Sequence, residues 1–69
     1  MKWAVCVAND DHPASLEVRK LYRVVADRKG EALGMIRVID ESGEDYLYPA
    51  GLFETISLAP PLERKLKRA

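Results

Sequence analysis

Short β-prone segments separated by turn-forming residues run along most of this chain. The first, residues 2–8, places Trp3, Val5 and Val7 at alternate positions, which is the two-residue period of a strand. Four further segments rich in branched or aromatic residues follow, at 20–26, 35–39, 46–48 and 54–58. Segments this short and closely spaced predict an all-β fold of about five strands, and a small barrel would remove most exposed sheet edges.

The connections between these segments carry turn signals. Residues 40–45 form a short polar connection in which Gly43 can take the positive φ that a hairpin loop commonly requires. Residues 49–53 begin with a proline, interrupt the strand pattern and favour a single 3₁₀ turn before the last strand. The connection at 27–34 contains two glycines, and one helical turn that ends at Gly34 is an open alternative to an irregular loop.

A chain of 69 residues has room for one hydrophobic core, which we expect to lie within residues 1–58. Cys6 is the single cysteine and His12 the single histidine, so the chain alone can build neither an internal disulfide nor a four-ligand zinc site. Residues 59–69 contain two successive prolines, which end the strand pattern, and the eight residues that follow make a helix of marginal stability. We therefore predict a flexible C-terminal tail.

The charges divide unevenly between these two parts. The net charge is zero, yet residues 1–58 carry seven basic and ten acidic residues, whereas the tail carries four basic residues and one acidic residue. The basic residues of the tail are Arg64, Lys65, Lys67 and Arg68. One hypothesis is therefore a nucleic-acid-associated accessory or regulatory protein that grips phosphate with this tail. A solubilising terminus explains the same residues, because so short a basic arm attracts nucleic acid only weakly at physiological salt.

Part of the pattern resembles known domains. The stretch 46–56, which reads Tyr-Leu-Tyr-Pro-Ala-Gly-Leu-Phe-Glu-Thr-Ile, resembles the end of SH3-like domains, where a Pro-containing segment enters a 3₁₀ turn before the last strand. Residues 15–49 are similar to a family of small uncharacterised bacterial proteins, and the whole resemblance covers residues 5–58. It implies an SH3-like barrel but no function, because such barrels serve unrelated roles. The aromatic-rich first loop of signalling SH3 domains has no counterpart at 9–13, where only His12 can stack on a partner.

The aromatic residues are the main candidates for a binding surface. These candidates are Tyr22, Tyr46, Tyr48 and Phe53. An aromatic strip of this kind would dock a protein partner, because aromatic side chains offer a large contact area at little entropic cost. Core packing explains the same residues, since Tyr46 and Tyr48 share one face of a strand. The leading hypothesis is a non-catalytic binding module that recruits a protein partner through this strip.

Patterns for catalysis or metal binding are weak. Cys6 lies in a predicted strand with no base beside it, so a buried free thiol is the simpler interpretation. Residues 10–12 and the acidic residues of 40–45 lack the ligand spacing of a metal or calcium site. The chain contains no phosphate-binding glycine loop and no nucleophile elbow. We therefore expect no enzymatic activity, no cofactor and no bound metal.

Hydropathy bears on location. The apolar run at residues 3–8 is shorter than the core of a signal peptide, and no apolar stretch approaches the length of a membrane span. The expected location is therefore the cytoplasm, without membrane contact. A homodimer formed by pairing of residues 2–5 with their own copy is left open, because a small sheet can leave one strand edge unpaired.

Overall fold

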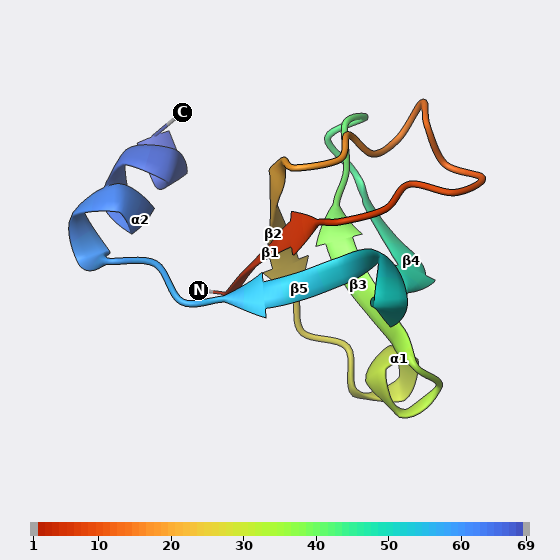
Figure 1. The fold of residues 1–69 in the computed structure, drawn as a ribbon. Coiled ribbons are helices and arrows are strands. Elements are labelled where there is room, and N and C mark those ends of the chain that lie inside the picture. Colours follow the sequence, from red (N-terminus) through yellow and green to blue (C-terminus); the bar gives the residue numbers. More distant parts are fainter. Residues whose placement is uncertain (1, 69) are drawn as a thin grey trace.

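Five antiparallel strands form one sheet in the computed structural model, which describes residues 2–68 and the side chains of residues 2–67. The strands are β1 (Lys2–Cys6), β2 (Leu21–Val25), β3 (Met35–Ile39), β4 (Asp45–Pro49) and β5 (Phe53–Ile56). Their order across the sheet is β4-β3-β2-β1-β5 (Figure 1). The predicted β-rich class with five strands is confirmed. Within the described chain no ladder of hydrogen bonds joins β4 to β5, so the sheet is open at these two edges.

The sheet is strongly curled around its core. Tyr48 in β4 and Phe53 in β5 lie at opposite ends of the strand order, yet their ring centroids are only 6.3 Å apart. Side chains alternate between the two faces of a strand, and in β1 Ala4 and Cys6 point into the core cluster. Trp3 therefore lies on the opposite face of the sheet. The two faces of the sheet therefore differ in what they bury.

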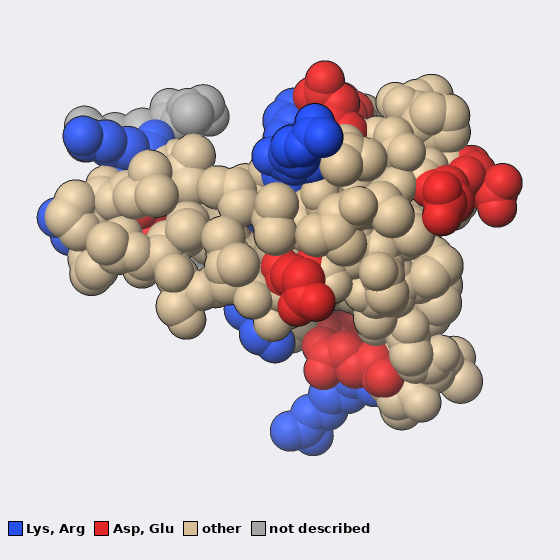
Figure 2. Space-filling model, in the orientation of Figure 1, with Lys and Arg blue, Asp and Glu red and all other residues tan. Residues whose placement is uncertain are grey.

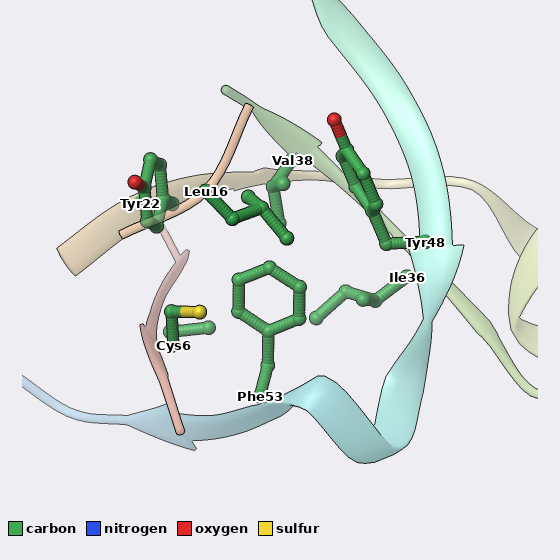
Figure 3. Close-up of a cluster of buried hydrophobic side chains, with 8 residues drawn as sticks. Cys6, Leu16, Tyr22, Ile36, Val38, Tyr48 and Phe53 are labelled. Atoms are coloured by element: carbon green, nitrogen blue, oxygen red, sulfur yellow. The ribbon is translucent and has the colours of Figure 1, made fainter. Parts of the chain in front are cut away.

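Eight buried side chains from the strands and one loop form the core, and Figure 3 shows how they converge. They are Ala4, Cys6, Leu16, Tyr22, Ile36, Val38, Tyr48 and Phe53. Leu16 comes from the β1–β2 loop and is fully buried, with its backbone N–H donating to His12 O at 3.0 Å. Burial of one such leucine contributes about 1.5–3 kcal/mol, so the loop is part of the core rather than a loose connection.

The connections mostly follow their turn signals. Gly43 and Gly34 have φ angles of 85° and 76°, the left-handed conformation that glycine adopts without strain. The connection before β3 contains α1 (Arg28–Ala32), whose start is capped by Asp27 accepting a hydrogen bond from Gly30 N at 2.9 Å. The 3₁₀ helix η1 (Ala50–Leu52) lies between β4 and β5, as predicted. The helical turn left open for residues 27–34 is therefore present.

Four strands differ from their predicted bounds: β2 and β4 by one residue at each end, and β1 and β5 by up to two residues. β1 ends at Cys6 instead of residue 8, because the N–H groups of Val7 and Ala8 both donate to Leu52 O, at 2.8 and 3.4 Å. β5 begins at Phe53, one residue earlier than predicted, and ends at Ile56, two residues earlier than predicted. Val7 and Ala8 therefore bond to the end of η1 instead of extending β1.

The tail differs most from its prediction. Residues expected to be flexible form α2 (Pro60–Arg68), which lies to one side of the sheet in Figure 1. The two prolines, Pro60 and Pro61, are compatible with helix here because they occupy its first turn, where backbone N–H groups have no partner within the helix. Glu63 and Lys67, four residues apart on the helix surface, form an ion pair in which Lys67 Nζ lies 3.5 Å from Glu63 Oε1.

None of the helices in residues 2–68 has the length and apolar character needed to cross a membrane.

Candidate functional site

The four predicted aromatic residues do not form one exposed strip. Tyr22, Tyr48 and Phe53 are 4%, 5% and 6% exposed and belong to the core, whereas Tyr46 is 50% exposed. Tyr46 and Tyr48 share one face of β4, as the strand period requires. Tyr48 packs against Phe53 in the core, while Tyr46 lies two residues nearer the β3–β4 turn and outside the core cluster. The exposed part of the predicted surface is therefore Tyr46.

A groove of about 400 Å³ lies beside Tyr46, and we call it the Tyr46 groove. Its walls come from the β1–β2 loop, the β3–β4 turn and strand β4. The lining residues are His12, Ser15, Asp40, Ser42, Tyr46, Leu47 and Tyr48. The His12 ring meets Tyr48 edge-on with a centroid distance of 4.9 Å. The groove runs along β4, which is a terminal strand of the sheet, and its volume lies within the range of about 300–1,000 Å³ that ligand sites occupy.

A buried carboxylate forms the polar end of the Tyr46 groove. Asp40 is 6% exposed, and its Oδ2 accepts a hydrogen bond from Tyr48 Oη at 2.5 Å. Its Oδ1 accepts from the backbone N–H of Ser42 at 2.8 Å and from Ser42 Oγ at 2.5 Å. Burial acts to raise the pKa of Asp40, but the hydrogen bonds from Ser42 and Tyr48 outweigh it, and the net pKa is lowered. Asp40 is therefore a charged, fully bonded group that fixes the shape of the β3–β4 turn.

A second set of contacts joins the β3–β4 turn to the β1–β2 loop and to β2. Tyr22 Oη donates to Glu41 Oε2 at 2.5 Å, and Lys20 Nζ lies 2.6 Å from the same oxygen. The hydrogen bond from Lys20 is the largest cause that lowers the pKa of Glu41, followed by the hydrogen bond from Tyr22. The backbone N–H of Glu41 also donates to Ser15 O at 3.0 Å. The β1–β2 loop and the β3–β4 turn are thus held at a set separation before any partner arrives.

The predicted basic residues lie on α2. Arg64 and Lys65 are exposed, Lys67 is paired with Glu63, and the side chain of Arg68 lies outside the described residues. Figure 2 shows Lys and Arg side chains over α2 at the left of the molecule. Figure 1 places α2 and β4 on opposite sides. The structure therefore does not bring the basic residues together with Tyr46.

Cys6 has the environment of a structural thiol. It is fully buried in the core, and its Sγ donates to Ala8 O at 3.1 Å. Burial raises the pKa of this thiol, which disfavours the reactive thiolate. As for metals, residues 2–67 contain no cluster of three or more His, Cys, Asp or Glu side chains arranged to hold an ion.

Sequence reasoning missed several groove residues, namely Ser15, Asp40 and Ser42 as lining groups. A local signal for two of them exists, because an aspartate followed two residues later by serine and then by Gly43 is typical of a turn in which the carboxylate bonds its own backbone. No pattern in the sequence indicates Ser15 as a lining residue, because it reaches the groove only when the β1–β2 loop folds beside β4.

Comparison with known proteins provides no relative from which a function could be inferred. The interpretation therefore depends on the chemistry of the Tyr46 groove itself. No protein-family model, curated protein or solved structure matches this chain.

Proposed function

We propose that this protein is a non-catalytic binding module that holds an extended segment of a protein partner in the Tyr46 groove. One observation carries the proposal: a half-exposed tyrosine lies beside an open groove of about 400 Å³, at which a hydrogen bond from Glu41 N–H to Ser15 O already joins the β3–β4 turn to the β1–β2 loop. Tyrosine is among the residues that contribute most to protein interfaces, because its ring gives a large contact area and its hydroxyl a hydrogen bond. Little ordering of the module is then required on binding.

The position of the groove suggests how a partner would lie. β4 is a terminal strand, so its outer backbone groups can pair with an added strand from another chain. An extended segment on this edge would pass Tyr46 and Leu47 and reach His12 of the β1–β2 loop. Backbone pairing would supply affinity, and the aromatic and apolar lining would select the side chains of the partner.

We further infer that the curled sheet is an SH3-like barrel. The meander from β1 to β4 and the 3₁₀ helix η1 before β5 support this interpretation. The close approach of Tyr48 and Phe53 supports it as well, since these residues come from the two terminal strands. The fold itself assigns no partner, because barrels of this kind serve many functions.

Binding of nucleic acid by α2 is the second candidate. It is favoured by the exposed Arg64 and Lys65 on a helix that lies to one side of the sheet. Among the described side chains of α2, only Arg64 and Lys65 are exposed cations without an ion-pair partner, which is few for a phosphate surface, and the acidic Glu63 lowers the charge of the same helix. We therefore place this function below binding at the Tyr46 groove.

Selection from a library of random 12-residue peptides tests the proposal. Selected peptides are measured by fluorescence anisotropy against the intact protein, Tyr46→Ala and the matched control Lys65→Ala. We expect Tyr46→Ala to weaken binding by more than about fivefold, as loss of a central aromatic contact commonly does, and Lys65→Ala to leave it unchanged. Binding should also persist between about 50 and 200 mM salt, where a phosphate-dependent complex would weaken. Equal affinity of the intact protein and Tyr46→Ala would overturn the proposal.

A further inference from the structure

The outer face of the sheet carries a second hollow that the proposed function does not use. It has a volume of about 340 Å³ and lies between the last turn of α2 and strands β1 and β2; we call it the Trp3 cavity. The residues that line it are Trp3, Lys20, Leu21, Tyr22, Arg23, Ile39, Asp40, Glu41, Gly43, Leu66 and Lys67. Its volume is at the lower end of the range for small-molecule sites.

Trp3 supplies the most unusual group in this cavity. The side chain is 7% exposed, and its indole Nε1 is buried without a hydrogen-bond partner among the described residues. A buried N–H without an acceptor is unfavourable, because it has lost its bond to water and gained none in return. Buried indole groups usually do find a partner. The Trp3 cavity therefore contains a donor that lacks its acceptor.

Among the described residues that line the cavity, Arg23 is the cation without an ion-pair partner. Lys20 is paired with Glu41, and Lys67 is paired with Glu63. Arg23 lies directly opposite Trp3 in the β1–β2 ladder, and no carboxylate of residues 2–67 lies within ion-pair distance of it. A guanidinium binds a carboxylate through two parallel hydrogen bonds, which neither water nor a neutral ligand matches.

We propose that the Trp3 cavity binds a small organic monocarboxylate with a short hydrocarbon body. One carboxylate oxygen accepts the hydrogen bond from Trp3 Nε1, and the same carboxylate pairs with the Arg23 guanidinium. The hydrocarbon body packs against the apolar part of the lining, namely Leu21, Ile39 and Leu66. One binding event thus satisfies the orphan donor and the unpaired cation and covers apolar surface.

The acidic residues of the lining argue against a more highly charged anion. Asp40 and Glu41 both carry negative charge, since hydrogen bonds lower the pKa of each carboxyl group. Among the described lining residues, Arg23 is the cation left to offset the charge of a ligand. A single negative charge therefore complements the cavity, whereas a phosphate dianion would be repelled by the two carboxylates.

Entry of the ligand requires a small rearrangement around the indole, because Trp3 Nε1 is itself out of contact with solvent. The last turn of α2 lines the cavity together with Trp3, and it is the element that we expect to move. This helix has nine residues, and Leu62 near its start is 45% exposed, so its apolar side is only partly covered by the sheet. A short helix held by few contacts moves at little cost in free energy.

The single tryptophan gives a direct assay, because all indole fluorescence of the protein comes from Trp3. The probe is sodium hexanoate, titrated at constant ionic strength, with hexanamide as the neutral control. We expect a saturable change in Trp3 emission with hexanoate, with half-saturation on the order of 1 mM. Hexanamide should bind at least about tenfold more weakly, because it cannot pair with Arg23. No saturable change, or an equal response to hexanamide, would overturn the proposal.

Two variants test the residues assigned, and two others serve as controls. Arg23→Gln should weaken hexanoate binding by about tenfold or more, and the matched control Arg28→Gln, on exposed α1, should bind as the intact protein does. Trp3→Phe keeps an aromatic ring but removes the N–H, so we expect it to bind hexanoate more weakly. Because this variant has no tryptophan, its binding is measured from the shifts of backbone amide resonances in NMR spectra. Tyr46→Ala should bind hexanoate normally, so failure of this proposal and failure of the Tyr46 groove are separate outcomes. Undiminished binding by Arg23→Gln and Trp3→Phe would show that the ligand lies elsewhere.

Discussion

Replacement of Tyr48 by phenylalanine removes one hydroxyl from the centre of the fold. Tyr48 Oη donates to Asp40 Oδ2 at 2.5 Å, and both side chains are at least nine-tenths buried. The ring stays in place in Tyr48→Phe, so the core keeps its packing with Phe53 and His12. The carboxylate oxygen of Asp40, however, loses its partner in a place that water does not readily reach.

The expected loss follows from the nature of this bond. A hydrogen bond to a charged group contributes about 1.5–3 kcal/mol, and an unsatisfied buried acceptor costs a similar amount, so we expect a loss of about 2 kcal/mol. A protein of 69 residues has a total stability of roughly 3–10 kcal/mol at the usual value per residue. One hydroxyl thus accounts for a substantial part of the stability, and the midpoint of thermal unfolding should fall by about 8–16 °C.

Urea unfolding and thermal unfolding, both followed by circular dichroism, measure this loss. The matched control is Tyr46→Phe, because Tyr46 is half-exposed and its Oη lies 3.5 Å from Glu44 Oε2, at the limit of a hydrogen bond. The control should change stability by less than about 0.5 kcal/mol. If Tyr48→Phe loses no more than the control, the bond to Asp40 does not stabilise the fold and the reasoning fails.

The same bond predicts a dependence on acid pH. The pKa of Asp40 is lowered in the folded protein, because its hydrogen bonds outweigh the effect of burial. A group of this kind stabilises the fold fully above its unfolded pKa of about 4, and the contribution is lost as pH falls through the folded pKa. The difference between the intact protein and Tyr48→Phe should therefore be constant near neutral pH and shrink below about pH 4. A difference that stays constant through this range would contradict the assignment.

Other changes test separate parts of the fold. Leu16→Ala opens a cavity at a fully buried site and should cost about 2–5 kcal/mol in urea unfolding; an unchanged midpoint would show that the β1–β2 loop does not close the core. Gly30→Ala places a Cβ 2.5 Å from Leu47 Cδ2 and should lower the thermal midpoint despite the better helix propensity of alanine, whereas Gly51→Ala meets open space and should not. Burial is the largest cause that raises the pKa of Tyr22, followed by the hydrogen bond to Glu41. The contribution of Tyr22 to the free energy of unfolding is therefore complete below about pH 10 and is lost as pH rises through the folded pKa. Unfolding free energies that stay flat between about pH 9 and 11 would refute this last expectation.

Much of the local structure can be predicted from the sequence because its causes are local. The bounds of β3 coincide with the predicted segment 35–39, and Gly43 has the positive φ expected of its turn. The 3₁₀ helix η1 lies where the sequence predicts it, directly after Pro49, which is the last residue of β4. These features depend on the steric preferences of neighbouring residues, which the sequence displays directly.

The candidate site was only partly predictable, because burial depends on residues far apart in the chain. The sequence pointed to four aromatic residues, and the fold leaves only Tyr46 half-exposed. Tyr48 is covered partly because His12, in another loop, packs its ring against it. Asp40 is buried because the β3–β4 turn bonds it to Ser42 and Tyr48 at once. Periodicity indicates which residues share a face of a strand but not how far the core extends beneath that face.

By itself the sequence determined where the chain can be extended and where it must turn, because φ, ψ and side-chain alternation are set by each residue and its neighbours. Only the tertiary structure decided where β1 ends, since the N–H groups of Val7 and Ala8 find Leu52 O across the fold. It also decided that the tail is helical, that Trp3 and the last turn of α2 line the same cavity, and that the indole N–H of Trp3 has no partner among the described residues. These outcomes depend on which distant groups meet and on the solvent that they exclude, and the order of residues along the chain does not display either.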